Sequence, residues 1–143
     1  MDKQPILQGS VHPLGSLSSY IYVAMVSRQN GCWLLSRHLQ RQTWETQGGH
    51  IERGETPLRA AHRELYEECG AKEYTMVPLC DYAAAGTTGV CFFAEVKSCL
   101  PLPVGSEMTE TKLFKHLPQN LTYPGITPVL FACAEEFILK NAL

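Results

Sequence analysis

The sequence lacks a long hydrophobic run, an excess of basic residues and a secretory signal, and each absence excludes a class of protein. The longest wholly apolar stretch, Tyr20 to Val26, has seven residues, whereas a membrane-spanning helix needs about 20. The 12 basic and 14 acidic residues give a net charge of −2, and a dedicated nucleic-acid-binding protein would carry a basic excess. The N-terminus has no charged and then apolar signal segment. We therefore expect a cytoplasmic protein with no membrane partner and no dedicated nucleic-acid binding.

Paired cysteines are also missing. The six cysteines are Cys32, Cys69, Cys80, Cys91, Cys99 and Cys133. No two form a CxxC motif, so the spacing favours neither a disulfide framework nor a zinc site. Cys32, Cys91 and Cys133 lie in apolar runs, and we expect them to be small hydrophobic residues of the core.

Charge is concentrated in one part of a chain whose 143 residues predict a single domain, 1–143. Six of the 12 glutamates lie between Glu45 and Glu68, and all six arginines lie between Arg28 and Arg63. The composition, 45% hydrophobic and 18% charged, is typical of a globular protein. The charged third of the chain is therefore where we expect the chemistry.

Local patterns predict strands mixed with two helices, and hence an α/β or α+β sandwich. After a lead-in loop over 1–19, with room for a short strand, Asn30-Gly31 indicates a hairpin turn. A long Gly-rich loop is expected over 38–55, of the kind that is usually functional in a compact domain. The expected strands are 19–27, 32–37, 74–82, 90–96 and 111–114, and the expected helices are 57–69 and 127–141.

The first helix has clear ends. Thr56 is a favourable N-cap, Pro57 suits the first helical position, and Gly70 suits the left-handed position that ends a helix. Its apolar stripe is predicted to be Leu58, Ala61, Leu65 and Cys69.

Three glutamates crowd the end of this helix. Glu64 and Glu68 are four residues apart and share a face, and Glu67 lies on the adjacent edge. Like charges at this spacing cost about 0.2–0.5 kcal/mol per pair, and the helix dipole disfavours acids in the last turns. A divalent cation with hard oxygen ligands would remove the conflict. From helix geometry alone, a solvated acidic surface remains an equal alternative.

The loop before the helix completes a longer pattern. It reads Gly49, five residues, Glu55, seven residues, and then Arg63-Glu64-Leu65-x-Glu67-Glu68-x-Gly70-Ala71. This pattern resembles the signature of the Nudix hydrolases, with every fixed position filled. The resemblance implies a Nudix-type α/β/α sandwich with a mixed central sheet and a loop-helix-loop site.

The resemblance also implies roles for individual residues. Relatives hydrolyse a nucleoside diphosphate linked to another group, with Mg²⁺ or Mn²⁺ as cofactor. The implied metal ligands are the carbonyl of Gly49 and the carboxylates of Glu64, Glu67 and Glu68, while Arg63 would orient a carboxylate. Glu55 would support the loop or the metal shell, or serve only as a favourable charge at the helix entry.

The general base and the substrate contacts are less constrained. The base is a box glutamate or a later one, and Glu107 is preferred over Glu110 because similar enzymes often place a glutamate at the position of Glu107. Catalytic candidates are therefore Glu64, Glu67, Arg63 and Glu107. Candidate substrate-binding residues are Arg37, Arg41, Arg53 and Trp44, with a surface role for each arginine and a packing role for Trp44 as the alternatives.

Two departures from related sequences bear on the loop and the substrate. Gln47 stands where relatives often have Pro, which we expect to loosen the loop. Ile126 stands where an antimutator branch has a base-reading Asn, which counts against the same recognition of 8-oxoguanine. The layout still resembles bacterial nucleotide-pool-cleaning enzymes of the 8-oxo-dGTP diphosphatase type.

The leading prediction is therefore a hydrolase of (d)NTPs or oxidised (d)NTPs that gives a nucleoside monophosphate and pyrophosphate. The alternatives are cleavage of ADP-ribose, a dinucleoside polyphosphate or a capped RNA end, or a Nudix module that binds a nucleotide without cleaving it. A small-molecule nucleotide is the expected partner, and a homodimer is possible because it is common among relatives.

Overall fold

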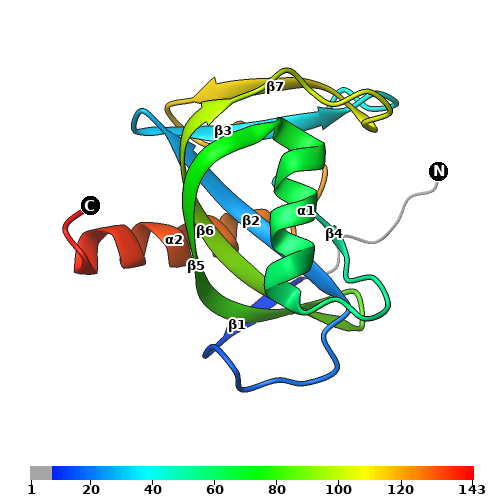
Figure 1. The fold of residues 1–143 in the computed structure, drawn as a ribbon. Helices are drawn as coiled ribbons and strands as arrows, with labels where there is room; N and C mark the ends of the chain where they lie inside the picture. Colours follow the sequence, from blue (N-terminus) through cyan, green and yellow to red (C-terminus); the bar gives the residue numbers. More distant parts are fainter. Residues whose placement is uncertain (1–7) are drawn as a thin grey trace.

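The computed structural model describes residues 8–143 and folds them into a mixed sheet with a helix on each face (Figure 1). The elements in chain order are β1 (Ser10–His12), β2 (Tyr22–Gln29), β3 (Cys32–His38), β4 (Gln47–His50), α1 (Pro57–Cys69), β5 (Ala71–Ala84), β6 (Thr87–Cys99), β7 (Met108–Phe114) and α2 (Thr127–Lys140). The predicted strands and helices are thus all found, and β5, β6 and β7 are longer than the sequence patterns indicated.

The strands run in the order β1-β5-β6-β2-β3-β7, and β4 pairs separately with β2. β2 and β6 are parallel, while the other pairs are antiparallel. Asn30 and Gly31 make the predicted turn between β2 and β3, both with positive φ, 53° and 76°. The sheet is therefore mixed, as expected.

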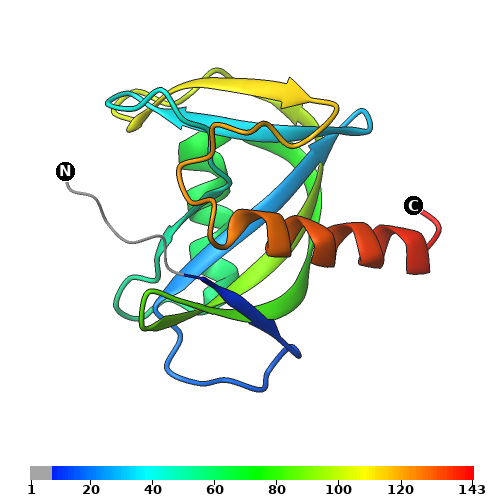
Figure 2. The same cartoon turned by 180° about the vertical axis from the view of Figure 1, so that it is seen from behind.

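Two hydrophobic cores lie on opposite faces of the sheet. Alternate residues of β2 serve each core: Val23 and Met25 pack with α1, whereas Ala24 and Val26 pack with α2. Figure 1 shows α1 over one face, and Figure 2, seen from behind, shows α2 over the other. The α/β/α sandwich with a mixed central sheet is therefore confirmed.

The predicted loop over 38–55 is wrong in one respect, because it contains β4. This short strand consists of Gln47-Gly48-Gly49-His50 and pairs with β2. A Cβ on Gly48 would lie 2.4 Å from the carbonyl oxygen of Val23, so only glycine allows this approach. Gln47, expected to loosen the loop, is instead fully buried and hydrogen-bonded.

Both ends of α1 are as predicted, but its buried face differs. The Thr56 side chain accepts a hydrogen bond from the amide of Arg59, and Gly70 is left-handed with φ 72°. Leu58, predicted to pack, is 47% exposed, and Ala60 is buried in the core instead. Leu58 shares a helix face with the buried Leu65, but it lies in the first turn of α1.

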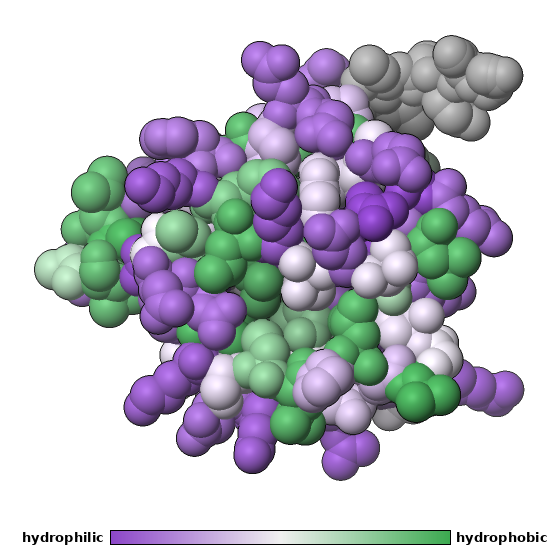
Figure 3. All heavy atoms as spheres, turned by 90° about the horizontal axis from the view of Figure 1, so that it is seen from above, coloured by the Kyte–Doolittle hydropathy of each residue, from purple (hydrophilic) through white to green (hydrophobic). Residues whose placement is uncertain are grey.

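Three further observations concern the surface, the helices and the cysteines. Figure 3, which looks down on the side of β3 and β7, shows hydrophilic side chains interspersed with smaller apolar groups. Among residues 8–143, no helix has the length and apolar character needed to cross a membrane. All six cysteines are free; Cys91 is buried, while Cys32 and Cys133 are half-buried.

Candidate active site

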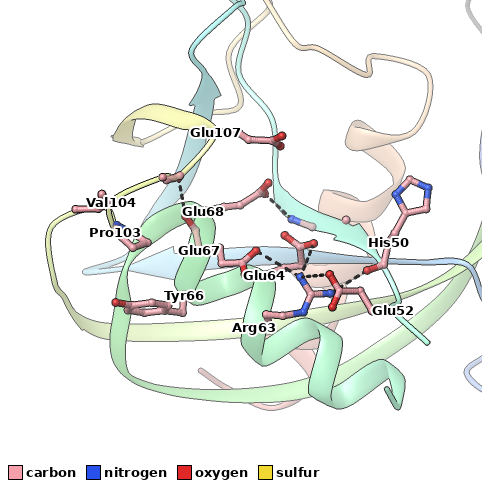
Figure 4. A pocket seen from close by; sticks show the side chains of 14 residues that line it. His50, Glu52, Arg63, Glu64, Tyr66, Glu67, Glu68, Pro103, Val104 and Glu107 are labelled. Atoms are coloured by element: carbon pink, nitrogen blue, oxygen red, sulfur yellow. Dashed lines mark hydrogen bonds and ion pairs between the residues drawn. The ribbon is translucent and has the colours of Figure 1, made fainter. Parts of the chain in front are cut away.

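A cavity of about 690 Å³ opens between three segments of the chain. One wall is the β4 segment and the loop after it, the second is the C-terminal half of α1, and the third is the loop that precedes β7 (Figure 4). The lining residues are Gly48, Gly49, His50, Glu52, Arg63, Glu64, Tyr66, Glu67, Glu68 and 103–107. The three acids that the helical spacing singled out therefore share one cavity with Glu107.

Arg63 is the centre of a set of ion pairs along the cavity floor. Its Nε and Nη2 donate to the two oxygens of Glu55 at 2.7 and 2.9 Å, a bidentate arrangement. Its Nη1 donates to Glu64 at 3.1 Å and to Glu67 at 3.4 Å, and Nη2 also donates to the carbonyl of His50 at 3.0 Å. The hydrogen bonds from Arg63 lower the pKa of Glu55 to about 2. Arg63 thus joins the loop of 50–55 to the helix.

Glu64 lies against the backbone of β4. A Cβ on Gly49 would be 2.1 Å from the Glu64 Oε2 atom, so the carboxylate can occupy this place only beside a glycine. Burial raises the pKa of Glu64, and the neighbouring Arg63 partly opposes that effect.

Glu68 is the most deeply placed of the three helix acids. Its Oε1 accepts a hydrogen bond of 2.9 Å from the amide of Gly48. Burial raises the pKa of Glu68 to about 8, and the charges of Glu64, Glu45 and Glu107 act in the same direction. Glu67 differs, because its side chain is 49% exposed at the cavity mouth.

The donor set suits a hard divalent cation. Carboxylate and carbonyl oxygens are the ligands of Mg²⁺, and the cavity presents three carboxylates beside the backbone of Gly49. Within residues 8–143, no three carboxylate, imidazole or thiol groups already converge as a cation site. Glu64 and Glu67 instead direct oxygens toward Arg63. The pKa of Glu68 is raised because its carboxyl is buried near other acids. A bound cation would offset this effect.

The four candidate substrate-binding residues do not line the cavity. Trp44 is 8% exposed and packs edge-on against Phe114, with ring centroids 5.1 Å apart. Arg37 donates to Glu110 at 2.9 and 3.1 Å. Arg41 pairs with Glu45 at 3.2 Å, and Arg53 is exposed in the loop before α1. The packing alternative thus describes Trp44 as the structure places it, and Glu107 but not Glu110 reaches the cavity.

Sequence reasoning missed several lining residues. Glu52, which pairs with Arg63 at 3.6 Å, and Tyr66 occupy variable positions of the box, so no motif singles them out. The loop 103–106 forms a whole wall, and the Ser106 hydroxyl donates to the carbonyl of Glu67 at 2.7 Å. No motif singles out this loop, and only the fold places it beside α1.

The chain also resembles known proteins. The model of the NUDIX domain matches residues 19–118. The chain belongs to the NUDIX domain family. A Bacillus subtilis protein named "Putative 8-oxo-dGTP diphosphatase YtkD" is 34% identical over 108 residues, which are 71% of this chain and 66% of that protein.

Two further similar proteins are named as pyrophosphohydrolases. An "RNA pyrophosphohydrolase" of Tolumonas auensis is 39% identical over 49 residues, 34% of this chain and 28% of that protein. A crystal structure of a mutant of the Bacillus subtilis pyrophosphohydrolase BsRppH superimposes with a TM-score of 0.77 at 24% identity, covering 92% of this chain and 90% of that one. The chain thus spans 66% of the length of YtkD and 28% of the length of the Tolumonas auensis protein. The likeness to the solved structure supports the fold.

Proposed function

We propose that this NUDIX protein hydrolyses a nucleoside diphosphate linked to another group, with a (d)NTP or an oxidised (d)NTP as the leading substrate. The observation that carries the proposal is the cavity itself, where the three helix carboxylates lie across from Glu107 beside Gly49. Such an acidic cavity repels a free polyphosphate, so the site needs a divalent cation to accept one. The name of the B. subtilis relative YtkD supports a nucleotide of this class.

The proposed reaction is attack of water on phosphorus. A water oxygen forms a bond to phosphorus, the bridging P–O bond breaks, and pyrophosphate leaves the nucleoside monophosphate. Mg²⁺ or Mn²⁺, when held by Glu64, Glu67, Glu68 and the carbonyl of Gly49, supplies neutralisation of the phosphate oxygens and a lower pKa for bound water. Arg63 keeps the carboxylates in place through the contacts described above.

The proton of the attacking water needs an acceptor. Glu67 is half-exposed at the cavity mouth, and Glu107 lines the opposite wall (Figure 4). Either carboxylate can take the proton, because both face the space that the substrate would fill. Glu110 is the weaker candidate since it pairs with Arg37 outside the cavity.

A second candidate substrate is the 5′ end of a triphosphorylated RNA. The names of relatives such as the RNA pyrophosphohydrolase of Tolumonas auensis favour it. ADP-ribose, dinucleoside polyphosphates and capped RNA ends remain further alternatives. A module that only binds nucleotides is less favoured, because it would have no need for three mutually repelling carboxylates.

The test is product release from a panel of nucleoside triphosphates, oxidised dGTP, ADP-ribose, dinucleoside polyphosphates and short 5′-triphosphorylated and capped RNAs. Each compound is assayed with Mg²⁺, with Mn²⁺ and with EDTA, and pyrophosphate and phosphate are measured separately. We expect pyrophosphate release from a nucleoside triphosphate that EDTA abolishes. Turnover of RNA ends alone would favour the second candidate, and no turnover of any compound would contradict an enzymatic role.

Glu64→Gln separates an enzyme from a binding module, because it removes the charge and keeps the shape. We expect it to lower turnover at least about 100-fold while the thermal unfolding curve keeps its cooperativity. Glu136→Gln is the matched control, since Glu136 is exposed on α2, away from the cavity. Equal turnover by the two variants would contradict the role of Glu64.

A further inference from the structure

A buried network of hydrogen-bonded polar side chains connects the middle of the sheet with the end of α1. Its members are Ser27 on β2, Gln47 on β4 and Ser36 on β3, with exposed fractions of 1%, 0% and 0%. None of them lines the cavity, and the proposed reaction does not use them. Buried polar groups of this kind require partners, so the partners that they have are informative.

The donor and the acceptor of each hydrogen bond in this network can be assigned. The Ser27 hydroxyl donates to Gln47 Oε1 at 2.7 Å, and Gln47 Nε2 donates to the Leu34 carbonyl at 3.1 Å and to the Ser36 hydroxyl at 2.9 Å. Because a carbonyl only accepts, the contact with Leu34 fixes which end of the Gln47 amide is nitrogen. Ser36 therefore accepts from Gln47 and has its own proton to donate elsewhere.

The Ser36 proton goes to the carbonyl oxygen of Glu68, at 2.8 Å. Carbonyls in the last turn of a helix have no intrahelical partner, and Glu68 is the last residue but one of α1. A side chain from β3 thus supplies the donor that the end of α1 needs. The carboxylate of the same residue accepts from the amide of Gly48, which directly follows Gln47.

We propose that Ser36 is a positioning residue for the cation site, with Gln47 holding its hydroxyl in place. The proposal rests on the proposed function, because it concerns the carboxylate of Glu68 as a ligand. Glu68 is held at two points, its carbonyl by Ser36 and its carboxylate by Gly48. Without the first contact the last turn of α1 can shift relative to β4, and the carboxylate moves away from Glu64 and Gly49.

The molecule contains its own control for this role. Ser27 and Ser36 are both buried serines bonded to Gln47, but only Ser36 contacts α1. Ser27→Ala leaves Gln47 Oε1 without its donor, and Ser36→Ala removes one of the two acceptors of Gln47 Nε2, so we expect a decrease in Tm in both variants. Only Ser36→Ala removes the contact with Glu68.

The experiment measures the Kd of Mn²⁺ alone by electron paramagnetic resonance, with Tm, kcat and KM for a nucleoside triphosphate on the same samples. We expect Ser36→Ala to raise the Kd about tenfold and to lower kcat by a similar factor, while KM changes less. Ser27→Ala is expected to leave both constants within about twofold of wild type, since the ligands and their direct partners are intact.

A second variant covers the case in which Ser36→Ala fails to fold. Ser36→Cys keeps nearly the same shape with a weaker donor, and we expect a smaller increase in Kd in the same direction. Equal Kd values for the variants of Ser27 and Ser36, or a wild-type Kd for Ser36→Ala or Ser36→Cys, would overturn the positioning role alone if wild type binds Mn²⁺ and turns over. A wild-type protein that neither binds Mn²⁺ nor hydrolyses any substrate would overturn the proposed function and this role with it.

Discussion

The two helices of the sandwich lie on opposite faces of one sheet and are built on different principles. α1 has a side-chain cap at Thr56, a left-handed Gly70 at its end, and a buried face of small residues with Leu65 as the one large side chain. α2 begins at Thr127, and Ile126 at its N-cap position makes no side-chain cap. The buried face of α2 contains Leu130 and Phe131. α1 is thus defined by local signals, whereas α2 depends on apolar packing.

The difference separates function from stability. The carboxylates of α1 repel one another and sit at the unfavourable end of the helix dipole, so they reduce stability at the place where we propose a cation site. The large apolar side chains of α2 contribute burial and reach no part of the cavity. Changes in α1 should therefore alter chemistry more than stability, and changes in α2 should do the opposite.

The largest expected effect is a loss of unfolding free energy when a buried side chain of α2 is truncated. Leu130→Ala deletes a side chain that is 2% exposed, and truncations of this kind cost about 2–5 kcal/mol of unfolding free energy. Denaturant unfolding measures the loss, and Leu139→Ala on the exposed side of the same helix is the control. The folded Leu130→Ala protein should retain wild-type Mn²⁺ affinity. A loss of Mn²⁺ affinity in the folded variant would contradict the claim that α2 serves stability and α1 serves chemistry.

The next largest effect is a decrease in kcat when Arg63 of α1 is replaced. Arg63→Lys keeps a positive charge but cannot make the two-point contact with Glu55 while also reaching Glu64. We expect kcat to fall about 10- to 100-fold, with a change in Tm smaller than that of Leu130→Ala. Arg59→Lys, on the exposed side of the helix, should behave as wild type. An unchanged kcat in Arg63→Lys would mean that charge alone suffices.

A smaller effect tests the cap of α1. Thr56→Ala removes the acceptor for the amide of Arg59 and should cost about 1 kcal/mol of unfolding free energy. Thr56→Ser keeps the acceptor and should restore most of it. The comparison by thermal unfolding would fail to support the cap if both variants were equally destabilised.

The smallest expected effect is the release of a proton when Mn²⁺ binds. Because the pKa of Glu68 is raised to about 8, its carboxyl is mostly protonated at pH 7 in the cation-free protein. Binding of Mn²⁺ should therefore release about one proton at pH 7 and much less at pH 9. Titration calorimetry in two buffers of different ionisation enthalpy measures the release, and Glu136→Gln should leave it unchanged. Equal release at both pH values would contradict the assignment to Glu68.

The same contrast explains what the sequence could predict. Thr56, Gly70 and the spacing of Glu64, Glu67 and Glu68 act within one helix, so their placement follows from local rules. The family signature adds Gly49 and Arg63 to this set, because it fixes their spacing from the helix glutamates along the chain. These are the elements of the site that the structure brings together.

Long-range pairing accounts for what could not be predicted. β4 has two glycines and no β-branched residue, and it forms only because β2 lies beside it. Arg37 and Trp44 are near the box in sequence, but the pairing of β3 with β7 places Arg37 opposite Glu110. Trp44 forms a bridge with Leu121 and packs against Phe114. The wall formed by 103–106 is likewise set by the fold. Residues that act through such contacts, Ser36 and Gln47 among them, carry no motif.

The most direct test of the central claim is a paired measurement on Glu67→Gln and Glu136→Gln. Each variant is assayed for Mn²⁺ binding and for Mg²⁺-dependent pyrophosphate release from the best nucleotide of the panel. The account predicts that Glu67→Gln loses at least about 100-fold in turnover and binds Mn²⁺ more weakly, while Glu136→Gln matches wild type in both. Wild-type turnover and Mn²⁺ affinity in Glu67→Gln would contradict the claim that the carboxylates of α1 form a cation-dependent hydrolytic site.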